Sequence, residues 1–248
     1  MTQTSDQPNW QWDETAKIST DYGDTAEARN YDNRHSHPDR NDAEYRQILD
    51  SLDPQPDWTL MDIGAGTGTF AIAAAGRCAE VHAVDISQAM LDIAAEKARD
   101  AGVENMEFLR GGFLTYQHAG EPYDAITSHL ALHHLPDIWK QIALGRLAEM
   151  LKPGGLFYLR DVVFQFEHAQ HAEVFDKWVE DAAERFGQAC MASKAESHIK
   201  REFSTFGWIM EGLLQRAGFE ILQADYSQRL VGYLCRKKGP CRISGEKA

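Results

Sequence analysis

Apolar and polar positions alternate in blocks along the middle of the chain. Short runs rich in apolar residues recur at 58–63, 80–85, 106–111, 123–130 and 156–163, and segments with helical spacing or turns separate them. Strands that alternate with helices predict βαβ units, which build a parallel sheet with helices on both faces. Right-handed crossovers then fix the winding of the units.

Two of the intervening segments carry clear helix signals. Ser87 is a suitable N-cap, Gly102 is a suitable C-terminal stop, and helical spacing between them gives an apolar face of Met90, Leu91, Ala94 and Ala98. Asp137 is expected to cap the other helix, whose apolar positions are Ile138, Ile142, Leu147 and Leu151.

A further helix is predicted at 171–186, between the fifth apolar run and the end of the chain. Its apolar residues recur at helical spacing: Val174, Phe175, Trp178, Val179, Ala182 and Phe186. Half of its remaining positions are acidic. The segment is therefore an amphipathic helix with one face available for packing.

Composition narrows the class of protein. The chain has 248 residues, a net charge of −13, and 43% hydrophobic and 25% charged residues, which is typical of a globular protein with a sizeable core. The negative charge argues against nucleic acid or an anionic membrane surface as partner, because phosphate binding needs clustered Lys and Arg.

No apolar stretch is long enough for a transmembrane helix, and the polar N-terminus is not expected to be a signal peptide. The four cysteines form no CxxC pair, so reduced thiols and a cytoplasmic location are expected.

The stretch "LMDIGAGTGTF" (60–70) holds three glycines, Gly64, Gly66 and Gly68, between the first predicted strand and its helix. In a doubly wound sheet, ligands bind at the carboxyl ends of the strands, and small residues there let a ligand lie against the backbone. Asp85 ends the next predicted strand and can accept both hydroxyls of a ribose. Together these features predict a site for a ligand that contains a nucleoside.

The glycine spacing distinguishes between classes of ligand that contain a nucleoside. A dinucleotide fingerprint is G-x-G-x-x-G, but the third glycine of that pattern would fall on Thr69. The observed G-x-G-x-G, with Asp62 two residues ahead, resembles the first motif of the class I S-adenosylmethionine-dependent methyltransferases. An acid there would repel a pyrophosphate, whereas it suits a ligand with an ammonium group and a sulfonium.

The resemblance extends over about 180 residues. "VDISQAML" (84–91), "YDAITSHLALHHLPD" (123–137), "LKPGGLFYLRD" (151–161) and the closing "LLQRAGFEILQADYSQRLVGYLCRK" are similar to family segments in the same order. The family implies a Rossmann-like α/β fold: a seven-stranded, mostly parallel sheet with an antiparallel last strand and helices on both faces. The expected parts are an N-terminal arm (1–40), a cofactor-binding core (41–163), a helical insertion over the acceptor site (164–203), a last helix with a terminal hairpin (204–237) and a tail (238–248).

The resemblance also implies a set of cofactor contacts. S-adenosyl-L-methionine would lie along the glycine loop, Asp85 would hold the ribose hydroxyls, and the arm segment "ARNYDNRH" would fold over the cofactor. The residues implied are Tyr31, Asp62, Gly64, Ala65, Gly66, Gly68, Asp85, Ile86, Met90, Gly112, Phe113 and His129. One position departs from the family pattern, because Gly112 stands where an Asp usually reads the adenine amino group. The backbone N–H of Phe113 remains available to adenine.

Catalysis is less clear from the sequence. Methyl transfer from a sulfonium is an in-line displacement at carbon that depends mainly on positioning and desolvation. A general base is needed only when the acceptor must lose a proton. The candidates are His133 and His134 after the fourth strand and Asp161 at the end of the fifth. No metal is expected, because none of the histidine pairs has a second group of Cys or carboxylates at ligand spacing in the sequence.

The sequence therefore predicts a methyltransferase that acts on a small-molecule acceptor, as a monomer or homodimer. Two alternatives stay open. One is a protein that binds the cofactor without transferring its methyl group, which the missing acid at Gly112 favours. The other is a tRNA or protein methyltransferase, against which the acidic charge and the segment "SHLA" after the fourth strand weigh.

Overall fold

A computed structural model of the chain describes residues 8–16, 28–29, 38–186, 189–227 and 229–239. Its sheet runs in the order β3-β2-β1-β4-β5-β8-β7. The strands are β1 (Thr59–Ile63), β2 (Glu80–Asp85), β3 (Met106–Arg110), β4 (Tyr123–His129), β5 (Leu151–Phe164), β7 (Phe219–Ser227) and β8 (Leu230–Lys237). β1 to β5 are parallel, and β8 is antiparallel to both of its neighbours. The predicted fold class is therefore confirmed, with one addition: β6 (Thr205–Phe206) pairs with the end of β5.

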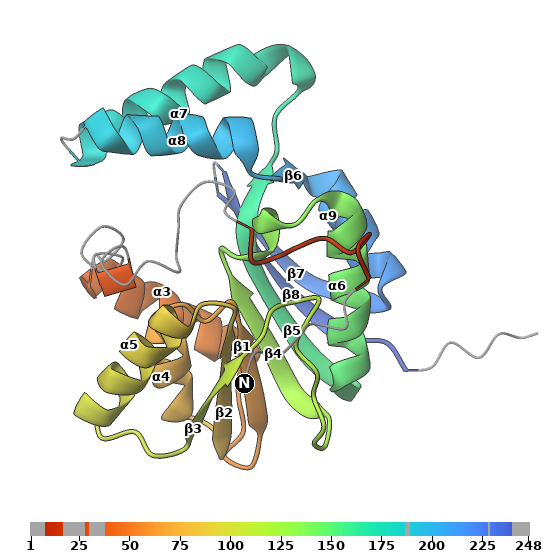
Figure 1. Cartoon of the computed structure of the whole chain (residues 1–248). Coiled ribbons are helices and arrows are strands. Elements are labelled where there is room, and N and C mark those ends of the chain that lie inside the picture. Colours follow the sequence, from red (N-terminus) through yellow and green to blue (C-terminus); the bar gives the residue numbers. More distant parts are fainter. Residues whose placement is uncertain (1–7, 17–27, 30–37, 187–188, 228, 240–248) are drawn as a thin grey trace, which may run out of the picture.

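Helices cover both faces of the sheet (Figure 1). One face carries α3 (Pro38–Leu52), α4 (Thr69–Ala75) and α5 (Gln88–Asp100), and the other carries α6 (Asp137–Met150) and α9 (Gly207–Arg216). Each face has its own apolar core: Leu60, Phe70 and Ala83 belong to the first, and Ile63, Leu144 and Leu214 to the second. Strands buried on both faces are expected where helices cover a parallel sheet.

The helix that begins after Asp85 forms as predicted. The Ser87 hydroxyl accepts a hydrogen bond from Met90 N at 3.2 Å, and the buried residues of α5 are Met90, Leu91, Ala94 and Ala98. Gly102 follows the helix with φ 69°, a backbone conformation that favours glycine.

The predicted face of α6 is confirmed at Leu147 and wrong at Ile138 and Ile142. Ile138 and Ile142 are 68% and 42% exposed, and the buried residues are Lys140, Ala143, Leu144, Leu147 and Ala148. Leu151 already belongs to β5, and Pro136 rather than Asp137 is the N-cap. The physical reason is Lys140, whose stem is buried while its ammonium group donates to Asp137 Oδ1 at 2.8 Å and to the carbonyl of Phe203.

Beyond the carboxyl end of β5, the chain forms a helical pair (Figure 1). The pair is formed by α7 (His171–Phe186) and α8 (Ala189–Arg201), which lie side by side, and the short turn η2 (His168–Gln170) precedes it. The predicted inward face of α7 is partly buried at Val174, Phe175, Trp178, Val179 and Ala182. Phe175 and Trp178 pack against Phe164 at the end of β5, with ring centroids 5.5 and 6.1 Å apart. These contacts attach the helical pair to the sheet.

Candidate functional site

The glycine loop follows β1 at the point where the strand order reverses. Gly64, Gly66 and Gly68 have φ values of 74°, 54° and 73°. Gly64 N and Ala65 N both donate to the carbonyl of Val84, at 2.8 and 3.1 Å, which fixes the loop to the end of β2. A Cβ on Gly66 would meet no heavy atom within 4 Å. The loop is thus held from one side and open on the other, as a site for a ligand that lies against the backbone requires.

Asp85 joins the end of β2 to this loop. Its Oδ2 accepts from Gly66 N at 2.8 Å, and its Oδ1 accepts from Ser87 N at 2.8 Å. Desolvation by burial raises the pKa of Asp85, while these backbone N–H groups oppose the rise. Each carboxylate oxygen has two lone pairs, so both can accept a further hydrogen bond. The side chain is therefore oriented, and it retains the capacity to hold two hydroxyl groups.

Asp62 lies beneath the loop in β1. It is 2% exposed, and its Oδ1 accepts from Thr127 Oγ1 in the neighbouring strand β4 at 2.8 Å. Burial raises the pKa of Asp62 to about 7, and the negative charge of Asp85 contributes to the rise. A nearby cation would favour the ionised form of this carboxyl.

The other predicted contacts lie around the end of β3. Ile86 approaches Gly112 so closely that a Cβ on Gly112 would stand 2.5 Å from Ile86 Cγ2. Phe113 is buried, and its carbonyl accepts from Arg146 Nε at 3.1 Å. Met90 is 2% exposed on the first turn of α5. The structure therefore brings Ile86, Gly112 and Asp85 to one edge of the sheet.

Glu14 is a residue that the sequence analysis missed. Its carboxylate accepts from Leu114 N at 3.1 Å and from Thr115 Oγ1 at 2.5 Å, and it lies against Gly112. Burial raises the pKa of Glu14, although these hydrogen bonds oppose the rise. An acid thus occupies the space beside Gly112, where the family pattern expects the side chain of an Asp, but it comes from a segment about one hundred residues away. No local pattern in the sequence signals this contact.

His129, at the end of β4, is enclosed by aromatic rings. Its ring centroid lies 4.3 Å from that of Phe70, 5.9 Å from that of Tyr158 and 6.1 Å from that of Tyr45. Burial lowers the pKa of His129 to about 3, so its imidazole is neutral. Its Nε2 has no hydrogen-bond partner among the described residues.

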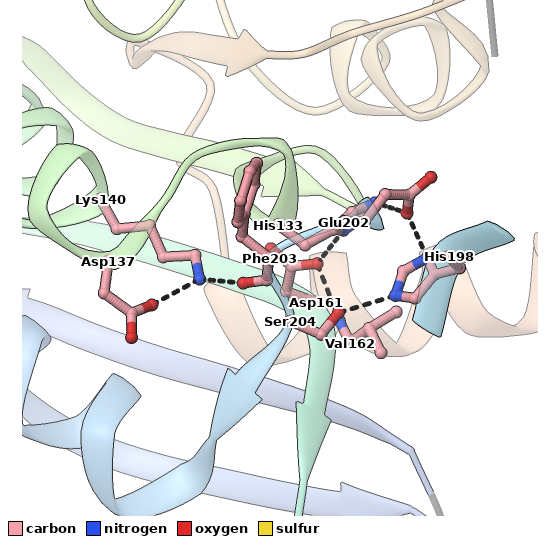
Figure 2. A network of polar contacts seen from close by, with 9 residues as sticks. All are labelled: His133, Asp137, Lys140, Asp161, Val162, His198, Glu202, Phe203 and Ser204. Atoms are coloured by element: carbon pink, nitrogen blue, oxygen red, sulfur yellow. Dashed lines mark hydrogen bonds and ion pairs between the residues drawn. The ribbon is translucent and has the colours of Figure 1, made fainter. Parts of the chain in front are cut away.

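His133 and Asp161 belong to a second polar group at the same edge of the sheet (Figure 2). His133 lies in the turn η1 (Leu132–His134), where its Nδ1 is 2.5 Å from Asp161 Oδ1 and its Nε2 is 3.3 Å from Glu202 Oε2. Glu202 also pairs with His198 Nδ1. Neither Glu202 nor His198 was predicted as a site residue, although their spacing of four on a helix is a recognisable signal.

The charged side chains of this polar group shift one another's pKa values. Burial opposes the imidazolium, but the carboxylates of Asp161 and Glu202 outweigh it and raise the pKa of His133 to about 9. Burial also opposes the charged form of Asp161, yet the neighbouring His133 holds its pKa below the ordinary value. Burial and the charge of His133 lower the pKa of His134 to about 4. His133 and Asp161 therefore form an ion pair, while His134 is neutral.

Comparison with known proteins identifies the family. A model of the methyltransferase domain matches residues 60–155. The uncharacterized methyltransferase GK2543 of Geobacillus kaustophilus is 30% identical over 187 residues, which cover 75% of this chain and 79% of that protein. The chain belongs to the class I methyltransferases. The predicted family is thus confirmed.

Other relatives of this methyltransferase carry more specific names. The ubiquinone/menaquinone biosynthesis C-methyltransferase UbiE of Brucella abortus is 29% identical over 173 residues, covering 67% of this chain and 63% of that protein. The solved structure titled as a DhpI-SAH complex has a TM-score of 0.60 and 18% identity, and the match covers 86% of this chain and 93% of that chain. At that identity the likeness concerns the fold.

Some predicted features of the methyltransferase are not tested. Tyr31 lies outside the described residues. The division into arm, core, insertion and tail, and the roles given to the individual site residues, stay predictions. Among the described residues, no helix has the length and apolar character needed to cross a membrane.

Proposed function

We propose that this protein transfers the methyl group of S-adenosyl-L-methionine to a small-molecule acceptor and releases S-adenosylhomocysteine. The observation that carries the proposal is the hydrogen bond from Gly66 N to Asp85 Oδ2, 2.8 Å long. This bond links Gly66, which has open space on its side-chain face, to the Asp85 carboxylate, which has lone pairs left for a ligand. Both lie at the edge of the sheet where doubly wound folds bind nucleosides.

The charges at this edge suit the proposed cofactor. Asp62 sits beneath the loop and would stabilise the ammonium and sulfonium groups, directly or through water. A dinucleotide would bring its pyrophosphate to the same place, next to two carboxyl groups. The SAH named for the DhpI complex, which is S-adenosylhomocysteine, is consistent with this choice.

Adenine would lie between the side chains of Ile86 and Met90 on one side and the turn after β3 on the other. Gly112 offers no side chain there. Glu14 is the nearest acid, and we assign to it the role that the family gives to the missing Asp. The backbone N–H of Phe113 is the second group assigned to adenine.

The acceptor would approach at the ends of β4 and β5, where His133, His134 and Asp161 lie. His133 pairs with a carboxylate through each of its ring nitrogens, an arrangement that suits positioning of an acceptor. Asp161 Oδ2 is buried and has no hydrogen-bond partner among the described residues, so it is able to accept a hydrogen bond from an acceptor. A base is required only for an acceptor that loses a proton.

The N-terminal segment and the helical pair would cover this space. Trp12 packs edge-on against Phe203, just after α8, with ring centroids 5.5 Å apart, and Trp10 stacks on Trp139 of α6 at 6.4 Å. The arm is thereby connected both to the insertion and, through Glu14, to the turn after β3. A cover of this kind excludes water from the sulfonium.

The remaining expectations follow from charge and composition. A net charge of −13 disfavours nucleic acid as the acceptor, and a small molecule fits best. A cytoplasmic location and a monomeric or homodimeric state stay predictions of the sequence.

The experiment that tests the proposal is transfer of a labelled methyl group. The protein is incubated with S-adenosylmethionine carrying a heavy methyl label and with fractionated metabolites, including demethylated quinone precursors suggested by the UbiE relatives. Mass spectrometry should find the label in a small molecule and S-adenosylhomocysteine in equal amount. Label recovered only in tRNA or protein would contradict the small-molecule acceptor.

A further inference from the structure

The two imidazoles and the carboxylate of His133, His198 and Glu202, hereafter the His133 cluster, converge on one point near the acceptor edge (Figure 2). We propose that the His133 cluster binds a divalent cation of the zinc type. Its three ligand atoms, one from each residue, all lie within 4.8 Å of one another. His133 lies in η1, His198 lies in the last turn of α8, and Glu202 directly follows that helix.

One of the donor spacings matches a tetrahedral ion. His133 Nε2 lies 3.3 Å from Glu202 Oε2, and His198 Nδ1 contacts the same oxygen. With metal–ligand bonds of about 2.0–2.1 Å, the corners of a tetrahedral site stand roughly 3.3–3.4 Å apart. To bind an ion, the side chains of His198 and Glu202 would therefore move apart, so that the ion replaces their direct contact.

The outer nitrogens of both imidazoles already have partners. His133 Nδ1 bonds to Asp161 Oδ1 at 2.5 Å, and His198 Nε2 bonds to Ser204 Oγ at 2.7 Å. Histidines that bind metals nearly always bond through the other ring nitrogen to a carboxylate, a carbonyl or a similar group, which fixes the ring orientation. Here both rings are fixed so that the remaining nitrogens face Glu202.

The surroundings favour a cation of this kind. The side chains of His133, Glu202 and His198 are 8%, 8% and 13% exposed, so an ion there would be largely dehydrated. Asp161 and Glu202 bring two carboxylates to the cluster. The cation would displace the proton on His133 Nε2, which is released to solvent. Two imidazoles with one carboxylate suit Zn²⁺ and similar transition metals, whereas Mg²⁺ and Ca²⁺ prefer oxygen ligands.

A second group of metal-ligand type, Glu80, His82 and Glu107, lies on β2 and β3 and serves as a comparison. Its single imidazole bonds through Nδ1 to Tyr123 Oη at 2.7 Å, and both carboxylates are 44% or more exposed. This group offers one nitrogen and two hydrated carboxylates, so it is a suitable control for weak surface binding.

Three protein ligands leave the fourth position of a tetrahedral ion for water or another donor, as in catalytic zinc sites. If the proposed function holds, that donor is the methyl acceptor, because His133 and Asp161 lie at the acceptor edge. This last step rests on the proposed function, whereas the binding of the ion does not.

The test measures metal binding by the full chain without cofactor or acceptor. Chelator-treated protein is titrated with Zn²⁺ in competition with a chromophoric chelator, and Co²⁺ is used as a spectroscopic probe. We expect one saturable Zn²⁺ per chain and a Co²⁺ spectrum typical of four-coordinate nitrogen and oxygen ligation. Glu202→Gln and His198→Gln should lower the Zn²⁺ affinity at least tenfold. Ser204→Ala, which removes only the orienting bond, should lower it about tenfold.

His82→Gln is the matched control and should bind Zn²⁺ as the wild type does. Circular dichroism melts show whether each variant is folded. If Glu202→Gln is not folded, the Zn²⁺ affinity of Ser204→Ala and the Co²⁺ spectrum of the wild type decide whether the His133 cluster binds the ion. Absence of saturable Zn²⁺ binding, or binding lost in His82→Gln and retained in Glu202→Gln, would overturn the proposal. Because no cofactor is present, failure of the methyltransferase assay leaves this result unaffected.

Discussion

The carboxyl group of Glu14 lies against the backbone of Gly112, so that a Cβ on Gly112 would stand 2.4 Å from Glu14 Cδ. An acid from the N-terminal segment and a glycine in the turn after β3 therefore share one space. A side chain on Gly112 would clash with both Glu14 and Ile86. The acid also fixes the turn through Leu114 N and Thr115 Oγ1.

This relationship predicts the effect of Glu14→Ala. The variant should bind S-adenosylhomocysteine about tenfold more weakly by calorimetry, because hydrogen bonds to a charged group contribute roughly 1.5–3 kcal/mol. Asp13→Ala is the control, since the Asp13 side chain bonds Thr15 in its own turn. Equal affinities of the Glu14 and Asp13 variants would remove Glu14 from the cofactor site.

Asp85 should matter more than any other single side chain in the cofactor site. Asp85→Ala leaves the ribose hydroxyls and two backbone N–H groups without their acceptor, so we expect a loss of about 1.5–3 kcal/mol, or roughly 10- to 150-fold, in cofactor affinity. Asp92→Asn, an exposed position on α5, is the control. An unchanged dissociation constant in a folded Asp85 variant would place the ribose elsewhere.

Gly64→Ala should lower the free energy of unfolding more than Gly66→Ala does. In Gly64→Ala the new Cβ would stand 2.4 Å from Ala131 Cβ at φ 74°, so the free energy of unfolding should fall by about 2–4 kcal/mol from strain and overpacking. In Gly66→Ala the Cβ meets open space, so the loss should be only about 1–2 kcal/mol from the left-handed backbone. Cofactor binding should nevertheless be lost in Gly66→Ala. Denaturant unfolding and calorimetry measure the two effects, and equal stability losses would contradict this description of the loop.

Asp62 should make cofactor binding depend on pH. Its pKa in the free protein is about 7 because it is buried, and a cationic ligand stabilises the carboxylate and lowers that pKa. Binding therefore releases a proton below pH 7, and affinity should fall as pH decreases through 7, by up to about tenfold per unit. Above pH 8 it should be flat. Calorimetry in buffers of different ionisation enthalpy detects the proton, and Asp62→Asn should abolish it. Proton release unchanged in Asp62→Asn would assign the effect to another group.

The sequence predicts the features that depend on residues close together in the chain. The strands, the Ser87 cap and the stop at Gly102 follow from spacing alone, and the order of the family motifs supplies the sheet topology. The face of α6 was predicted wrongly because pattern alone gives a buried position to Ile138 and an exposed one to Lys140. In the structure, Asp137 and the Phe203 carbonyl satisfy the lysine's ammonium group, so its stem can be buried.

The site residues that the sequence did not predict belong to contacts between distant parts of the chain. Glu14 meets Leu114 across one hundred positions, and Glu202 meets His133 across sixty-nine. In the sequence, His133 and His134 have no second group of Cys or carboxylates at ligand spacing, so no metal was expected. Folding places the end of α8 beside η1 and supplies both His198 and Glu202. Such contacts depend on where the helical insertion packs, and the local pattern carries no information about that position.

The most direct test of the account is calorimetric titration of the wild-type protein with S-adenosylhomocysteine and, separately, with NAD. The G-x-G-x-G loop, the open side of Gly66 and the acids Asp62 and Asp85 predict saturable binding of one S-adenosylhomocysteine per chain and no measurable binding of NAD. Saturable binding of NAD with none of S-adenosylhomocysteine would contradict the account.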